Sequence, residues 1–166
     1  MIDIHTHILP GIDDGAKDLT ESLALLKLAE NDGITHMVAT PHIHVGRFNN
    51  ATAQIKNDLE SLKQEAHKEG INVKLAAAAE VRLDIELMAM VMANKLPFIG
   101  KIADKNVLLL ELPHSHMPQG TLASSIMRLA ADFEPIASMA LAGGPTKIIP
   151  ASSQARQKAA FSDRKP

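Results

Sequence analysis

An α/β fold with a mainly parallel sheet is predicted by two features of this sequence. Short apolar segments typical of strands alternate with amphipathic segments typical of helices, which is the pattern that right-handed β-α-β crossovers produce. Several apolar segments also end in a histidine or a glutamate, and the functional residues of such folds lie at the carboxyl ends of the strands. The 166 residues suffice for one domain with a sizeable core.

The predicted strands and helices follow one another closely from the first residue onward. Apolar character predicts strands over residues 1–7, 34–40, 73–81 and 107–112, and helical spacing of apolar residues predicts helices over residues 19–31, 51–69 and 85–94. Thr20 is the candidate N-cap of the first helix, and Gly33 and Gly70 follow the first two helices as terminating glycines often do. Residues 121–131 favour a further helix, and residues 135–142 are weakly strand-like or helical.

The chain divides into two regions of different character. Residues 1–142 form the predicted α/β domain, whereas residues 143–166 lack any sustained period and are rich in Gly, Pro, Ser and Gln. Residues 144–166 also contain five basic residues against one acidic residue. We expect this basic tail to be disordered.

Composition argues against several classes of protein. A net charge of −2 and an aromatic content of 2% disfavour nucleic-acid binding, which uses basic and aromatic surfaces. The sequence has no cysteine, so a metal would be held by histidine and carboxylates, and a cytoplasmic location is expected. Neither a signal-peptide pattern nor an uncharged apolar run of about 18 residues is present, so no membrane span is expected.

The opening segment contains the strongest functional signal, a pair of histidines one residue apart. Alternation along a strand places His5 and His7 on the same face, so two imidazoles lie side by side. Asp13 and Asp14 follow in a Pro-Gly turn, and imidazole with carboxylate is a common ligand set for zinc, manganese or iron. Asp14 is therefore a candidate ligand, although aspartate also favours turns for reasons of its own.

Three later segments end in the same kinds of side chain. His42 follows a buried strand, and Glu80 and Glu111 follow or end apolar runs in which a lone carboxylate is costly to bury. Metal ligation would explain all three, and a salt bridge to Lys or Arg is the alternative for the two glutamates. Arg47, just beyond His42, could bind a phosphate in the reaction or be a solvated loop residue.

A histidine and carboxylate cluster of this kind suits hydrolysis assisted by metal ions. A metal can hold a bound water as hydroxide near neutral pH and polarise a phosphoryl oxygen. The sequence has no P-loop, GxGxxG motif or nucleophile elbow that would favour another chemistry. A metal-dependent phosphoesterase is the predicted class.

Four segments within the first 120 or so residues carry a family resemblance: MIDIHTHILPGIDDGAKDLTESL, GITHMVATPHIHVGRF, AAAAEVRLD and LLLELPHSHMPQG. In order and spacing they resemble the bacterial manganese-dependent tyrosine-protein phosphatases of the polymerase-and-histidinol-phosphatase (PHP) superfamily. These enzymes are encoded beside capsular or exopolysaccharide tyrosine kinases. The resemblance implies a distorted (β/α)7 barrel that hydrolyses phosphotyrosine on a bacterial tyrosine autokinase. A homo-oligomer is a further candidate assembly.

The resemblance also implies up to three metal ions, Mn²⁺ with Fe, Zn, Co or Mg as alternatives. Carried over by position, His5, His7 and Glu80 hold the first metal, and Glu80 bridges to a second metal that Glu111 also binds. Asp14 and His42 serve the third metal.

The sequence departs from the family after residue 120. The family continues with a His-Pro-Glu-Arg strand end and an Asp-x-His motif, whereas residues 140–147 and 162–164 stand near these places without a histidine. We therefore expect each metal site to lack one ligand, the barrel to be incomplete at its C-terminal end, and the chain to be a truncated or frame-shifted product of uncertain catalytic completeness. The alternatives are another PHP phosphoesterase, such as a histidinol-phosphate phosphatase, and a non-catalytic remnant that binds metal or the kinase.

Overall fold

A computed structural model describes residues 1–93, 95–102, 105–112 and 133–138 of the chain. The helix predicted over residues 121–131, the boundary and tail predicted at residues 142–166, and the two departures from the family lie outside the described residues. So do the second half of the LLLELPHSHMPQG segment and its two histidines.

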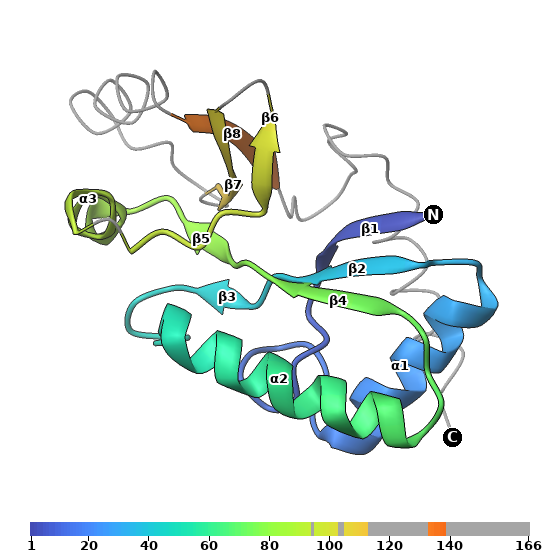
Figure 1. The fold of residues 1–166 in the computed structure, drawn as a ribbon. Coiled ribbons are helices and arrows are strands. Elements are labelled where there is room, and N and C mark those ends of the chain that lie inside the picture. Colours follow the sequence, from blue (N-terminus) through green and yellow to red (C-terminus); the bar gives the residue numbers. More distant parts are fainter. Residues whose placement is uncertain (94, 103–104, 113–132, 139–166) are drawn as a thin grey trace, which may run out of the picture.

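The described residues form a mixed α/β fold with a curled sheet (Figure 1). The strands are β1 (Ile2–Thr6), β2 (His36–Ala39), β3 (His42–Ile43), β4 (Lys74–Ala77), β5 (Glu80–Arg82), β6 (Gly100–Ile102), β7 (Lys105–Glu111) and β8 (Phe133–Ser138). The helices are α1 (Leu19–Asn31), α2 (Thr52–Lys68) and α3 (Ile85–Met92). The predicted alternation of strands and helices is confirmed, and α1 has the predicted bounds.

The strands pair in parallel, in the order in which the chain supplies them. β1, β2 and β4 are neighbours in one ladder, and β3, β5 and β7 are neighbours in the next. β8 pairs in parallel with nearly all of β7, including the end with which β5 pairs, so β8 lies on the edge of β7 opposite β5. β6 is the antiparallel exception and pairs with the first half of β7.

The two ladders are joined across short breaks. The predicted strand 73–81 is interrupted by two residues, which separate β4 from β5. The predicted strand 34–40 contains β2 alone, and two residues separate β2 from β3. The break after β2 contains Pro41, which has no N–H to give to a ladder. Hydrogen bonds still cross the gap, from Ala78 N to Ala39 O at 2.9 Å and from Glu80 N to Pro41 O at 3.0 Å. The strands β3 and β6 were not predicted because segments of two or three residues give no readable period.

The N-cap predicted for α1 is wrong. Asp18, not Thr20, precedes the helix, and its Oδ1 accepts a hydrogen bond from Glu21 N at 2.9 Å. Thr20 is already inside the first turn, where its backbone has helical geometry and cannot serve as the cap. The acidic residue at this end also interacts favourably with the helix dipole.

Helices α1 and α2 lie side by side against the same side of strands β1, β2 and β4 (Figure 1). The buried face of α2 consists of Ile55, Leu59, Leu62 and Ala66, at the i, i+4, i+7 and i+11 spacing of one helical stripe. This stripe packs into one apolar core with side chains of the strands, including Met37, Val81 and Leu108. Helix packing thus fixes the sheet whose strand ends carry the candidate ligands. Among the helices that the structure describes, none combines the length and apolar character needed to cross a membrane.

Candidate metal centre

The parallel sheet brings the predicted ligands to one edge. His5 lies near the end of β1, His7 directly follows this strand, and His42 and Glu80 are opposite each other at the starts of β3 and β5. Glu111 ends β7 in register with Arg82. These residues come from strands of both ladders, and the structure brings their side chains together at the distances given below.

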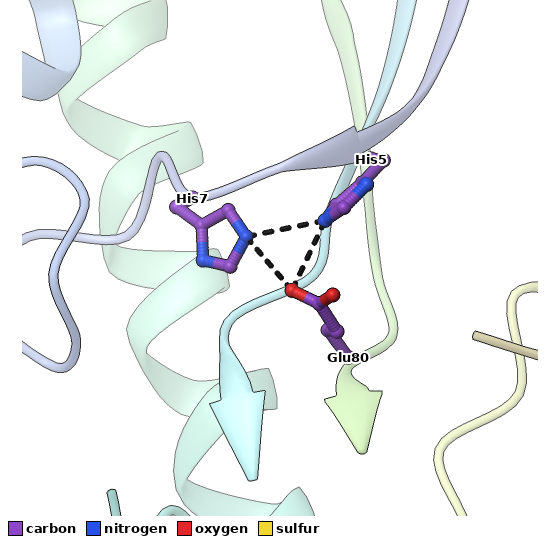
Figure 2. Close-up of side chains that lie close together, drawn as sticks. All are labelled: His5, His7 and Glu80. Atoms are coloured by element: carbon purple, nitrogen blue, oxygen red, sulfur yellow. Dashed lines mark hydrogen bonds and ion pairs between the residues drawn. The ribbon is translucent and has the colours of Figure 1, made fainter. Parts of the chain in front are cut away.

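His5, His7 and Glu80 form the centre of the cluster (Figure 2). The Nε2 atoms of the two imidazoles lie 3.2 Å apart, and Glu80 Oε2 lies 3.1 Å from the first and 3.2 Å from the second. His5 and Glu80 are buried. Three donor atoms therefore face one another in a small space with little solvent, as ligands of a single metal ion do.

His42 joins this centre to two further carboxylates. Its Nδ1 lies 3.4 Å from Glu80 Oε2 and 3.3 Å from Glu111 Oε2, and its Nε2 lies 3.3 Å from Asp14 Oδ1. His7, Asp14 and His42 form a second group whose donor atoms are close enough to share a metal ion. Burial lowers the pKa of His42, but the Glu111 and Glu80 carboxylates outweigh this effect and raise it overall.

The donor set fits a metal ion. His42 Nδ1 is buried and has no hydrogen-bond partner among the residues that the structure describes, although two carboxylates lie within 3.4 Å of it. A buried polar atom without a partner is costly, and a cation between this nitrogen and the carboxylates would satisfy it. The clustered oxygen and nitrogen donors suit manganese, iron, zinc or magnesium better than a soft metal.

Sequence reasoning did not single out Asp13 as a site residue. Its carboxylate is fully buried, and Oδ2 accepts a hydrogen bond from His7 Nδ1 at 2.8 Å. Burial opposes the charged form of His7, yet the hydrogen bonds and charges of Asp13 and Glu80 raise the pKa of His7 to about 10. Burial likewise works against the Asp13 carboxylate, but His7 and backbone N–H groups lower its pKa overall.

Arg82 was also missed, although the alternative of a salt bridge for Glu111 anticipated a partner of this kind. Arg82 Nη1 lies 2.5 Å from Glu111 Oε1, which leaves Oε2 for His42. The pKa of Glu111 is lowered, because His42 and Arg82 together outweigh the burial that would raise it. Glu111 therefore has both partners, a salt bridge on one oxygen and the cluster on the other.

Arg47 and Asp14 lie at the solvent side of the cluster. Arg47 Nη2 is 3.7 Å from Asp14 Oδ2, and the two side chains are 60% and 52% exposed. The guanidinium lies over the ring of Phe48, 4.8 Å from its centroid, and Phe48 stacks on His42 with 8° between the ring planes. An exposed arginine is thus held beside the candidate ligands, where it can reach a bound anion.

The loop between β1 and α1 is folded tightly against His7. Ala16 N donates to His7 O at 3.0 Å, and Gly11 N donates to Ala16 O at 2.8 Å. A Cβ on Gly15 would lie 2.1 Å from His7 O and 2.4 Å from His7 Cβ, so only glycine fits there. Gly15 therefore allows the loop to bring both aspartates to the cluster.

Replacing Gly15 by alanine is expected to displace His7 and lower the free energy of unfolding by more than about 2 kcal/mol, as overpacking does. The matched control is Gly100→Ala, because a Cβ at Gly100 meets nothing within 4 Å. Urea unfolding of both variants, followed by a titration with Mn²⁺, measures the two effects. Equal stability and equal metal binding in the two variants would contradict the close approach described above.

A mixed α/β fold with a cluster of histidines and carboxylates beside its strands is typical of metal-binding α/β proteins. A family model described as "Capsular polysaccharide synthesis, CpsB/CapC" matches residues 1–138. The chain belongs to this family.

Individual relatives agree with the family match. The chain is 32% identical to CapC of Staphylococcus aureus over 121 residues, covering 73% of this chain and 46% of CapC. It is 33% identical to the tyrosine-protein phosphatase YwqE of Bacillus subtilis over 119 residues, covering 72% of this chain and 46% of YwqE. The chain thus spans about half the length of the curated relatives it matches.

A solved structure shares the fold. It comes from crystal structures of YwqE from Bacillus subtilis and CpsB from Streptococcus pneumoniae, which are described as metal-dependent tyrosine phosphatases. The TM-score is 0.69 at 30% sequence identity, over 82% of this chain and 54% of the other. The predicted α/β class and the family resemblance are therefore confirmed.

Proposed function

We propose that this protein is a metal-dependent phosphatase that hydrolyses phosphotyrosine on a protein substrate in capsular or exopolysaccharide synthesis. The observation that carries the proposal is the convergence of two imidazole nitrogens and a carboxylate oxygen within 3.2 Å of one another at the strand ends. Family membership and the described activity of YwqE and CpsB support the substrate class over the alternative of histidinol phosphate.

In this proposal the cluster holds up to three metal ions, with Mn²⁺ as the preferred species. His5, His7 and Glu80 bind the first metal, and Glu80 and Glu111 bind the second. Asp14 and His42 bind the third. When bound, such ions supply a hydroxide-like nucleophile and polarise the phosphoryl oxygens. The group of His5, His7 and Glu80 supports the first assignment, and the group of His7, Asp14 and His42 supports the third.

Arg47 is the proposed catalytic residue of the chain itself. Its guanidinium is exposed and lies 3.7 Å from Asp14 Oδ2, so it can leave this carboxylate and bind the phosphate oxygens of an incoming substrate. Contact with the Phe48 ring limits the orientations of the side chain and lowers the entropy lost on binding. Arg47 would thereby orient the phosphate toward the cluster.

The finer fold and the setting also belong to this proposal. Parallel strands in chain order, with β8 added beyond β7, support a PHP-type (β/α)7 barrel. The proposed partner is a bacterial tyrosine autokinase, with assembly into a homo-oligomer. A sequence without cysteine is compatible with the reducing cytoplasm, where we place the protein.

Turnover of a phosphotyrosine peptide and of p-nitrophenyl phosphate, with and without Mn²⁺, tests the proposal. The purified chain is expected to release phosphate only with metal, and His5→Ala is expected to reduce this rate by about 100-fold or more. His67→Ala is the matched control, because His67 is exposed on α2. Absence of metal-dependent turnover would overturn the proposal and favour the non-catalytic alternative.

A further inference from the structure

We propose that Asp13 is a positioning residue of the metal centre: its carboxylate fixes the ring orientation and tautomer of His7 and anchors the backbone of His42. The inference rests on the proposed metal-binding function of the cluster. It assigns a role to a residue that is not itself a candidate ligand.

The hydrogen bonds of Asp13 extend well beyond its own turn. Oδ1 accepts from Gly15 N at 2.9 Å, which is the local bond expected of an aspartate in a turn. Oδ2 accepts from His7 Nδ1 at 2.8 Å and from His42 N at 3.0 Å, and these residues belong to different strand ends. Formation of the turn explains the bond to Gly15 but does not explain the bonds to His7 and His42.

The bond to His7 determines which ring nitrogen is available to a metal. A carboxylate only accepts hydrogen bonds, so His7 Nδ1 must carry the proton that it shares with Asp13. Nε2 of the neutral ring is then the free nitrogen, and it is the atom that faces His5 Nε2 and Glu80 Oε2. Histidine ligands in metal sites are commonly held by a carboxylate in this way.

The bond to the His42 backbone links the two groups of candidate ligands. His7 belongs to both groups, and His42 belongs to the second. The buried carboxylate of Asp13 therefore restrains the ring of His7 and the start of β3, the strand that carries His42. Displacing Asp13 should affect metal binding at both groups rather than at one.

Three N–H groups point at the two oxygens of Asp13, which makes the isosteric amide a sharp test. In Asp13→Asn the NH₂ group must face either Gly15 N or the pair formed by His7 and His42 N, and a donor meets a donor in each orientation. The change preserves the size of the side chain while removing one acceptor. Asp18→Asn is the matched control, because asparagine caps a helix as well as aspartate does.

Titration calorimetry of the full chain with Mn²⁺ measures the effect. We expect Asp13→Asn to bind Mn²⁺ about 10- to 100-fold more weakly than wild type, as changes in groups behind metal ligands do. We expect Asp18→Asn to match wild type. Equal affinity in the Asp13→Asn variant would overturn the proposal.

A second measurement needs no folded variant. In the wild-type protein loaded with diamagnetic Zn²⁺, ¹H–¹⁵N spectroscopy is expected to show a proton on His7 Nδ1 that exchanges slowly with water. A proton on Nε2 instead, or a rapidly exchanging Nδ1 proton, would overturn the proposal. Failure of the proposed phosphatase function is separate, since it would appear as Mn²⁺ binding without turnover of the phosphotyrosine peptide.

Discussion

Glu80→Gln is expected to abolish Mn²⁺ binding at the cluster of His5 and His7 and, with it, metal-dependent phosphate release. Oε2 of Glu80 lies 3.1 Å from His5 Nε2, 3.2 Å from His7 Nε2 and 3.4 Å from His42 Nδ1, so one oxygen faces three imidazoles. The amide removes the negative charge that a metal ion and these rings share. We expect affinity to fall by more than about 100-fold, beyond the range for groups behind the ligands.

A surface glutamate provides the control for this substitution. Glu60→Gln removes one exposed pair with Lys63 on α2, which contributes little to stability. Calorimetric titration with Mn²⁺ and metal analysis of the purified variants give the comparison. Unchanged Mn²⁺ affinity in Glu80→Gln would mean that Glu80 does not bind the metal and only forms ion pairs with the nearby histidines. This outcome would favour the salt-bridge alternative for Glu80, with histidine in place of Lys or Arg.

The candidate ligands could be predicted because each is an exception within an apolar strand. Glu80 after four alanines and Glu111 after three leucines are expensive to bury alone, so their types and positions indicate a shared site. Strand ends on one side of a parallel sheet lie together, which fits His5 and Glu111, whereas His42 and Glu80 are opposite each other at the starts of β3 and β5. For these residues, pattern and topology are sufficient.

Asp13 and Arg82 could not be predicted in the same way. In the sequence Asp13 and Asp14 are adjacent turn residues, and only the loop conformation, with Gly15 pressed against His7, turns one inward and leaves the other exposed. Arg82 acquires its role from strand register, which places it opposite Glu111. Strand register and loop conformation depend on packing between segments that are distant in sequence. The spacing of hydrophobic residues along one segment does not specify this packing.

Metal-free protein is expected to lose stability as the pH rises from about 6.5 toward 10. The raised pKa of His7, about 10, exceeds the ordinary value of 6.5 because the Asp13 and Glu80 carboxylates outweigh the effect of burial. A group whose pKa is higher in the folded state stabilises that state fully below its unfolded pKa, and the contribution disappears as pH passes through the folded pKa. The full contribution is on the order of 5 kcal/mol.

Metal binding should have the opposite dependence on pH. A metal ion and a proton compete for His7 Nε2, so raising the pH removes the competitor and strengthens Mn²⁺ binding. The gain in unfolding free energy on adding Mn²⁺ should therefore widen between pH 6.5 and about 8.5, in contrast to the decline in EDTA. Urea unfolding at several pH values, with EDTA or with Mn²⁺, measures both trends.

The Asp13→Asn variant tests whether the Asp13 carboxylate causes this pH dependence of stability. Without the Asp13 charge the pKa of His7 should fall toward its ordinary value, so the stability of the metal-free variant should vary less with pH than that of wild type. A wild-type curve in EDTA that stays flat over this range would contradict the assignment. The source of the metal affinity would then have to be sought in groups other than Asp13 and Glu80. A cation and a proton are held at this cluster by the same negative charge, so carboxylates that do not hold the proton would not hold the metal ion either.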